Sequence, residues 1–157
     1  MFVPDDFTVP EAAESPAFTV RPIGINDAVK DYDAVMTSRE RLRGVFGPTS
    51  TWPGDDLSLE QNIVDLAWHQ KEFQRRTSFA FAVMSSDEQE ELGCVYLYPS
   101  SRPDFDVEAY LWVRADSAHL DEELYGFVRD WLVAAWPFRN PAFPGRTVPW
   151  DAWTAPD

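Results

Sequence analysis

Hydrophobic side chains recur most regularly in the segment that follows residue 117. They lie three or four residues apart at Leu120, Leu124, Phe127, Val128, Trp131, Leu132 and Ala135. Because this spacing places side chains on one face of an α-helix, it predicts an amphipathic helix from about Ser117 to Trp136. Pro137 ends the predicted helix, since proline lacks the backbone donor that another helical turn needs.

A second helix is predicted before the middle of the chain. Ser58, with Gln61 three residues later, forms a capping box for a helix that extends to about Arg76. Its apolar positions are Leu59, Ile63, Leu66, Ala67 and Phe73. The preceding residues 44–56 contain several Gly and Pro, including Trp52-Pro53-Gly54, which predicts a long loop.

Near the start of the chain, the pattern predicts a strand followed by a helix. Residues 18–23 alternate in the manner of a strand, and Pro22 favours an edge or a strand end. Asn26 can cap the helix, and Gly44 ends it. Its apolar positions are Ala28, Tyr32, Val35, Met36 and Leu42.

Three further strands follow the second helix. They span Phe79 to Met84, Gly93 to Tyr98 and Val107 to Val113, with a polar turn between the first two. Short connections favour an antiparallel meander. The order of elements predicts one domain of the α/β (α+β) class, with a mixed, mainly antiparallel sheet that is flanked by helices.

The two ends of the chain differ from this central domain, which we place at residues 17–138. Residues 1–16 are acidic and contain three prolines, so they are expected to form a flexible leader or a strap on the surface. Residues 139–157 hold prolines and aromatic side chains, which predicts a tail that packs on the domain.

The chain of 157 residues has a formal net charge of -14. This charge repels nucleic acid and anionic lipid, so neither is an expected partner; a cationic amine or a basic protein fits better. We see no signal sequence and no membrane span, and we expect a cytoplasmic protein that could form a homodimer. Cys94, the only cysteine, is expected to be a buried thiol. The two histidines, His69 and His119, are isolated, so we expect no metal site.

Three segments of the sequence resemble the Gcn5-related N-acetyltransferase (GNAT) superfamily. They are Phe79-Ala80-Phe81-Ala82-Val83, Leu92-Gly93-Cys94-Val95-Tyr96-Leu97 and Glu108-Ala109-Tyr110-Leu111-Trp112-Val113. Residues 38–43, followed by the Trp-Pro loop, also resemble a group of bacterial members. The resemblance implies transfer of an acyl group from acetyl-CoA to a small or cationic amine.

The resemblance also implies where acetyl-CoA would bind. Strand residues Leu111, Trp112 and Val113 would offer backbone groups to the pantetheine arm, and this strand is expected to splay from the one around Cys94. A glycine-rich loop should then hold the pyrophosphate. This chain has Asp116, His119 and Asp121 at the three signature positions of that loop. Arg114 and His119 are therefore the candidate basic contacts.

For the chemistry, the resemblance points to Glu108 as a general base and Tyr125 as a general acid. Trp52, Tyr96 and Tyr98 could line the site for the acceptor amine. Each residue has a structural alternative: Glu108 a position that faces solvent, and the aromatic residues a role in packing. The altered loop leaves a second function open, namely a catalytically inactive GNAT-like domain that binds a ligand or a protein.

Overall fold

A computed structural model describes residues 2–154 of the protein. Its centre is a six-stranded β-sheet. Its strands are β1 (Ala13–Glu14), β2 (Thr19–Pro22), β3 (Phe79–Met84), β4 (Glu91–Pro99), β5 (Val107–Val113) and β6 (Pro141–Ala142). They lie side by side in chain order. Each neighbouring pair is antiparallel except β5 and β6, which are parallel. The predicted meander and the mixed, mainly antiparallel sheet are confirmed.

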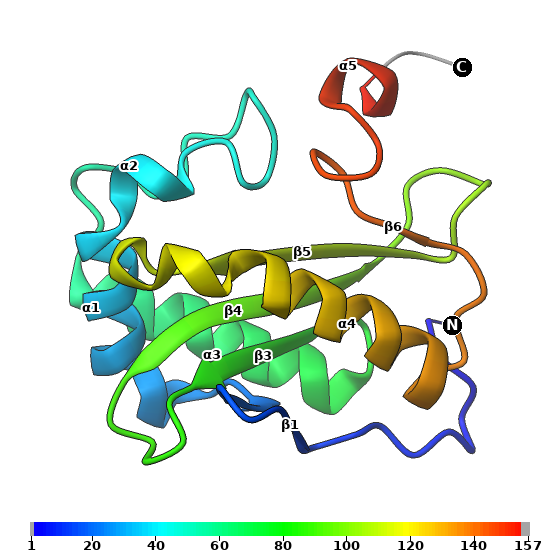
Figure 1. Ribbon diagram of the computed structural model, residues 1–157, viewed down its shortest axis with the longest axis horizontal. Coiled ribbons are helices and arrows are strands. Elements are labelled where there is room, and N and C mark those ends of the chain that lie inside the picture. Colours follow the sequence, from blue (N-terminus) through cyan, green and yellow to red (C-terminus); the bar gives the residue numbers. More distant parts are fainter. Residues whose placement is uncertain (1, 155–157) are drawn as a thin grey trace.

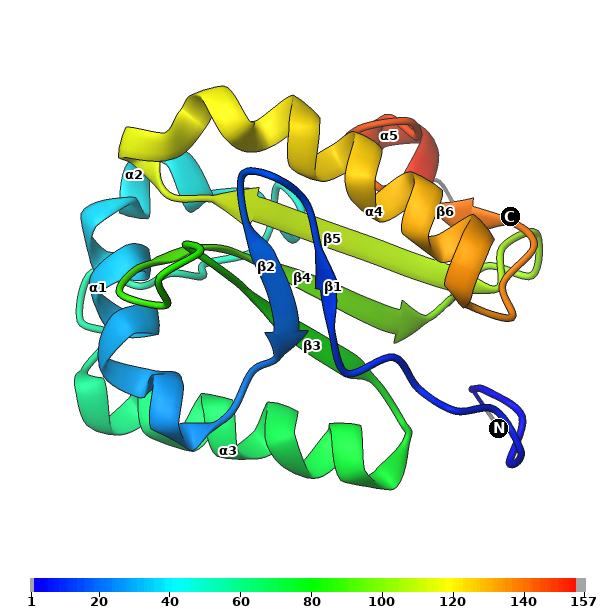
Figure 2. The same cartoon turned by 60° about the horizontal axis from the view of Figure 1, so that its bottom comes forward.

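Helices cover both faces of this sheet (Figure 1; Figure 2). They are η1 (Ile25–Asp27), α1 (Ala28–Thr37), α2 (Arg39–Leu42), α3 (Leu59–Arg75), η2 (Ala115–Leu120), α4 (Asp121–Ala135) and α5 (Trp150–Trp153). Helices α1 and α3 lie on one face, and α4 crosses the other. The first predicted helix is divided into η1, α1 and α2, and Gly24, rather than Asn26, precedes it.

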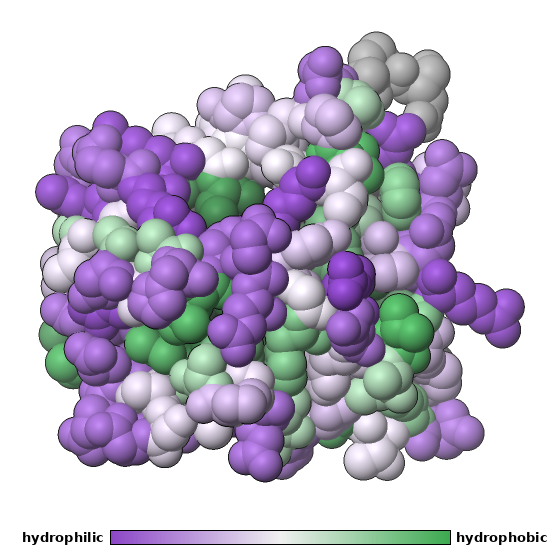
Figure 3. Space-filling model, viewed as in Figure 1, coloured by the Kyte–Doolittle hydropathy of each residue, from purple (hydrophilic) through white to green (hydrophobic). Residues whose placement is uncertain are grey.

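Alternation along the strands sorts the core into two halves. In β3, Phe79, Phe81 and Val83 belong to the half under α4, whereas Ala80, Ala82 and Met84 belong to the half under α1 and α3. The α4 side of the core thus contains bulky rings. Figure 3 views the α4 side of the molecule and shows mostly hydrophilic residues there, with small hydrophobic areas between them.

A β-bulge interrupts the alternation at the start of β4. Val83 pairs with Gly93, but the next residue, Met84, pairs with Glu91, so Leu92 is an extra residue. The bulge turns Glu91 toward the α1 side, where Cys94 also lies. Gly93 is required here because a Cβ atom would lie 2.1 Å from the backbone oxygen of Trp112.

The first and the last segments that the structure describes both contact the domain. Val3 is buried, the ring of Phe2 stacks on Phe79, and Arg76 donates hydrogen bonds to the carbonyl oxygens of Pro4 and Phe7. Residues 2–16 thus lie along the domain, because Val3 belongs to its core and Phe2, Phe7, Val9 and Ala13 pack against that core. At the other end, Phe143 is buried.

Candidate functional site

A cavity of about 320 Å³ lies on the α1 and α3 side of the sheet. We call it the aromatic pocket. It is lined by Ile23, Asp31, Phe46, Trp52, Asn62, Asp65, Leu66, Trp68, His69, Tyr96 and Tyr98. These residues come from the end of β2, from α1, from the loop after α2, from α3 and from β4, so the pocket forms only when the whole domain folds.

Phe, Trp and Tyr supply five of the eleven residues that line the pocket. Tyr96 and Tyr98 project from the same face of β4, and their rings are parallel within 6° at a centroid distance of 6.2 Å. Phe46, from the long loop, packs edge-on against Tyr96 at 5.1 Å and against Trp52 at 5.2 Å. Trp68, on α3, is 64% exposed and borders the pocket on the solvent side.

Two carboxylates lie among these rings. Asp31 is buried and accepts a hydrogen bond of 2.8 Å from Asn62 Nδ2, while Asp65 is half-buried and pairs with Gln61. Burial raises the pKa of Asp31 and lowers the pKa of His69. His69 is therefore neutral at pH 7, and neither Lys nor Arg lines the pocket. The pocket is aromatic and acidic without a compensating cation among the described residues.

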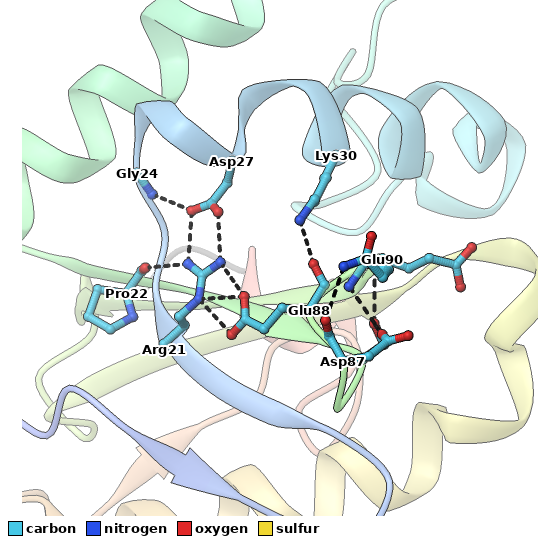
Figure 4. Close-up of polar contacts among 10 residues, drawn as sticks. Arg21, Pro22, Gly24, Asp27, Lys30, Asp87, Glu88 and Glu90 are labelled. Atoms are coloured by element: carbon cyan, nitrogen blue, oxygen red, sulfur yellow. Dashed lines mark hydrogen bonds and ion pairs between the residues drawn. The ribbon is translucent and has the colours of Figure 1, made fainter.

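Arg21 is the centre of an ion-pair network beside the pocket, drawn in Figure 4. Its guanidinium donates to both carboxylate oxygens of Asp27, at 2.8 and 3.0 Å, and to both oxygens of Glu88. Lys30 donates to the backbone oxygen of Glu88. These bonds join β2, η1 and α1 to the turn before β4. Asp31 follows Lys30 directly and Glu91 lies three residues after Glu88, and their carboxyl groups lie close to each other.

The structure brings the three predicted acceptor residues, Trp52, Tyr96 and Tyr98, together in the aromatic pocket. Four polar groups of the pocket were not predicted as site residues, namely Asp31, Asn62, Asp65 and His69. A signal for Asp31 was present, because it lies three residues after Ala28 and four before Val35, two positions of the predicted apolar face.

Glu108, the predicted base, is buried rather than facing solvent. Its Oε1 accepts hydrogen bonds from the backbone and hydroxyl of Ser101 at 2.7 and 2.8 Å, and its Oε2 accepts one from Tyr110. It does not line the aromatic pocket. With each oxygen already hydrogen-bonded, Glu108 anchors the loop that joins β4 to β5.

Tyr125, the predicted acid, lies on the opposite side of the sheet. Its ring packs edge-on against Phe143 at 5.1 Å, and the guanidinium of Arg146 lies 5.7 Å from the ring centroid. Tyr125 belongs to the core half under α4, whereas Glu108 lies on the other face of β5. The structure thus does not bring the two predicted catalytic residues together.

The expected splay of β5 from the strand around Cys94 is wrong. Strands β4 and β5 are paired without interruption over the whole length of β5. The pairing begins with Gly93 opposite Val113 and ends with Pro99 opposite Val107. Divergence occurs instead between β5 and β6, which pair at only two positions. Beyond them lies a second cavity of about 220 Å³, the edge cleft, lined by Gly44, Val45, Ala109, Tyr110, Leu111, Pro144, Gly145, Arg146 and Trp150.

Side chains from the C-terminal segment line the edge cleft. Trp150 stacks on Tyr110 at 6.4 Å and 12°, close over Gly145, where a Cβ atom would lie 2.5 Å from the Trp150 ring. Arg146 donates to the backbone oxygen of Leu111 at 3.5 Å, and Arg41 donates to that of Val113 at 3.2 Å. Two carbonyl oxygens of β5, those of Leu111 and Val113, are thus already hydrogen-bonded to arginine side chains.

Asp121 lies at the start of α4, where the resemblance places a pyrophosphate group. Its carboxylate accepts hydrogen bonds from Arg146 at 2.7 and 2.8 Å and lies 3.3 Å from Arg41. The hydrogen bonds from Arg146 hold the pKa of Asp121 below its usual range. A carboxylate of the chain therefore takes the place and the partners that a phosphate group would need.

The remaining predicted cofactor contacts differ in their surroundings. Arg114 is buried and bonds to Asp116 at 2.8 Å and Asp33 at 3.4 Å. His119 is exposed in η2. The side chains of Leu111 and Val113 lie in the core half under α4, and that of Trp112 lies in the half under α1 and α3. Arg114, one of the two predicted basic contacts, is thus already paired with carboxylates of the chain.

Comparison with known proteins defines the class of fold. No family model and no curated protein matches the sequence. Among solved structures, the ribosomal-protein-S5-alanine acetyltransferase from Vibrio fischeri is 18% identical with a TM-score of 0.60, and 79% of this chain aligns with 68% of that one. A putative GnaT-family acetyltransferase from Bordetella pertussis is 16% identical with a TM-score of 0.57, over 80% and 70% of the two chains.

A third similar structure is the microcin C7 self-immunity acetyltransferase MccE in complex with acetyl-CoA and AMP. It is 9% identical with a TM-score of 0.56, over 82% of this chain and 71% of that one. The chain therefore has the GNAT fold, and the structural neighbours described here are acetyltransferases. Within residues 2–154, no helix has the length and apolar character that crossing a membrane requires.

Proposed function

We propose that the protein is a GNAT-fold domain that binds a small organic cation, such as an amine, in the aromatic pocket, without transferring an acyl group. The observation that carries this proposal is the composition of the pocket lining. Aromatic rings, Asp31 and Asp65 line a cavity of about 320 Å³, and no Lys or Arg lines it. A cation over an aromatic face gains about 0.5–2 kcal/mol, most where water is excluded.

The charge of the whole chain supports the same ligand class. A formal charge of -14 attracts cations to the protein surface. The half-buried Asp65 adds a negative charge in the pocket lining itself. Tyr96 and Tyr98 remain neutral because burial raises the pKa of both hydroxyls. Their rings thus contribute electron-rich faces, and their hydroxyls can bond a polar group of the ligand.

The proposal is tested by calorimetry with choline, spermidine and 3,3-dimethylbutanol, an uncharged isostere of choline. We expect one or both cations to bind and the isostere to bind at least about 10-fold more weakly, since it lacks the charge that rings and carboxylates attract. Trp52→Ala and Asp65→Asn should each weaken cation binding about 5- to 10-fold.

Glu60→Gln is the matched control, because Glu60 is exposed on α3 and lies outside the pocket lining. This variant should bind as the wild type does. Equal binding of the charged and uncharged compounds, or no binding of either cation, would contradict the proposal.

A second candidate is N-acyl transfer from acetyl-CoA to an amine held in the aromatic pocket. The divergence of β5 from β6 and the acetyltransferase neighbours favour it. It requires that Trp150 and Arg146 leave the edge cleft. Under this second candidate, Glu108 and Tyr125 would need to reach the reacting groups, whereas both are engaged in packing or hydrogen bonds.

Acetyl-CoA binding separates the two candidates. We expect the wild type to bind acetyl-CoA only weakly, because the Asp121 carboxylate repels phosphate and occupies Arg41 and Arg146. Asp121→Asn should tighten binding at least about 10-fold by releasing both guanidinium groups. Glu123→Gln, an exposed change in the same helical turn, is the control. Micromolar binding by the wild type, with acetyl transfer to amines, would establish the second candidate instead.

A further inference from the structure

Three side chains with metal-binding groups meet beneath the aromatic pocket. Asp31 comes from α1, and Glu91 and Cys94 come from β4. One ligand atom of each lies within 4.8 Å of the other two, and all three residues are buried. Asp31 is also part of the pocket wall, so this cluster borders the cavity rather than being sealed off from it.

Glu91 is a buried acidic residue in an unusual environment. Its side chain is fully buried, and neither carboxylate oxygen accepts a hydrogen bond from a donor group among the described residues. The Asp31 carboxyl group can bond to it only if the two groups share a proton. Burial and the neighbouring Asp31 carboxylate raise its pKa well above the usual range. A buried polar group without a partner costs about 1–3 kcal/mol, and an unpaired charge costs more.

The cations near Glu91 are committed to other groups. Arg21 is bonded to Asp27 and Glu88 (Figure 4). Arg114 bonds to Asp116 and Asp33, and its contact with Glu91 is to the backbone oxygen, at 3.5 Å, not to the carboxylate. The carboxyl groups of Asp31 and Glu91 therefore face each other without a positively charged neighbour bound to Glu91.

The backbone is arranged to produce this placement. In a regular strand, residues three apart point to opposite faces, yet the bulge at Leu92 places Glu91 on the same face as Cys94. The bulge depends on Gly93, since no larger residue fits against the Trp112 backbone. A regular strand would have kept the carboxylate of Glu91 away from the thiol of Cys94.

We propose that Asp31, Glu91 and Cys94 bind a divalent transition-metal ion of the zinc class. Zn²⁺ accepts carboxylate oxygen and thiolate sulfur together, and three protein ligands with one open position are typical of zinc sites that interact with a ligand. The open position would face the aromatic pocket, because Asp31 lies in the pocket wall. This proposal does not depend on the binding of an organic cation.

The geometry and charge of the cluster suit such an ion. Bond lengths of about 2.0–2.3 Å place tetrahedral ligand atoms about 3.5 Å apart, so side-chain adjustments of about 1 Å complete the site. Metal binding releases the protons of the Cys94 thiol and of the carboxyl groups to solvent. Three anionic ligands around a divalent ion leave a net negative charge, which keeps the pocket attractive to cations. The sequence-based expectation of no metal site considered histidine spacing, whereas this cluster contains no histidine.

Cobalt is the sharpest probe of the proposal. Protein freed of metal with a chelator is titrated with Co²⁺, and we expect one ion per chain with a thiolate-to-Co²⁺ charge-transfer band in the near ultraviolet. Cys94 is the only cysteine of the chain, so this band identifies the site. Saturating Zn²⁺ should abolish the band and raise Tm by about 5–10 °C.

Two variants and a control complete the test. Glu91→Gln keeps the shape of the side chain and should weaken Co²⁺ binding at least about 10-fold, and Cys94→Ser should remove the charge-transfer band. Glu90→Gln, which changes the exposed neighbour, should behave as the wild type. A folded wild type without the band, or a Glu91→Gln variant that binds Co²⁺ equally well, overturns the proposal. Stabilisation by Glu91→Gln in a protein that binds no Co²⁺ would overturn it too, and would indicate a carboxyl pair that shares a proton.

Discussion

Replacing Trp112 with alanine is expected to lower the free energy of unfolding by about 3–5 kcal/mol, the range for loss of a large buried ring. Trp112 is 2% exposed, its Nε1 donates to the Tyr96 hydroxyl at 3.0 Å, and its ring lies beside Trp52. The substitution removes apolar contacts and also leaves the buried Tyr96 hydroxyl without this donor.

Chemical denaturation of the variant and the wild type measures this effect. Trp68→Ala is the matched control, because Trp68 is 64% exposed; its loss should change stability by no more than about 0.5 kcal/mol. Trp112→Ala should also weaken cation binding, since Tyr96 and Trp52 line the aromatic pocket. A loss below about 1 kcal/mol would mean that the core under α1 and α3 is less tightly packed than the structure shows.

Replacing Arg21 with methionine is expected to lower the free energy of unfolding by about 2–3 kcal/mol at pH 7. The guanidinium joins Asp27 and Glu88, and the Asp27 side chain is only 10% exposed, so the variant leaves a largely buried carboxylate unpaired. The estimate lies below that for a fully buried pair because Arg21 itself is 31% exposed.

The effect should depend on pH with a defined sign. Burial alone would raise the pKa of Asp27, but hydrogen bonds from Arg21 and Gly24 lower it below the usual value. A lowered pKa contributes stability above the pKa of the unfolded chain, about 3.9, and loses it as the pH falls through the folded value. The difference between wild type and variant should therefore shrink below about pH 4.

Arg129→Met is the control for Arg21→Met, because Arg129 forms an ion pair with Asp130 in which both side chains are more than half exposed. Its loss should change stability by less than about 1 kcal/mol. Denaturation curves at several pH values measure both variants. A difference for Arg21→Met that is the same at pH 3 and pH 7 would contradict the role given to Asp27.

The sequence predicted the elements whose patterns are local and regular. The capping box at Ser58 marks the start of α3, and the bounds of β3 and β5 agree with the structure residue for residue. The long periodic segment forms α4, although its first residues form η2. These elements were predictable because spacing alone determines which side chains face the core.

The candidate site was less predictable because it depends on contacts between distant residues. Trp52, Tyr96 and Tyr98 were expected near an acceptor site and do share one cavity, whose function stays a prediction. The meeting of Asp31 with Glu91 was not foreseen. It depends on the bulge at Leu92, which follows from the register between β3 and β4 and leaves no spacing signal in the sequence.

The positions of Trp150 and Arg146 in the lining of the edge cleft could not be predicted from the sequence either. The tail was expected to pack on the domain, but the pattern did not indicate where Trp150 or Arg146 would lie. Likewise, the resemblance placed Asp121 at a signature position of the pyrophosphate loop, yet the pairing of Asp121 with Arg41 and Arg146 depends on the folded arrangement of three separate segments.

The two outermost strands, β1 and β6, contain only two residues each. Such short edge strands offer another chain few unpaired backbone groups. Prolines in or near them, at positions 10, 16, 141 and 144, also lack a backbone N–H donor. The sheet is therefore protected against growth by added strands, which is the usual route to aggregation of β-structure. If two copies associate, we expect them to do so through helix or loop surfaces and not by joining their sheets into one.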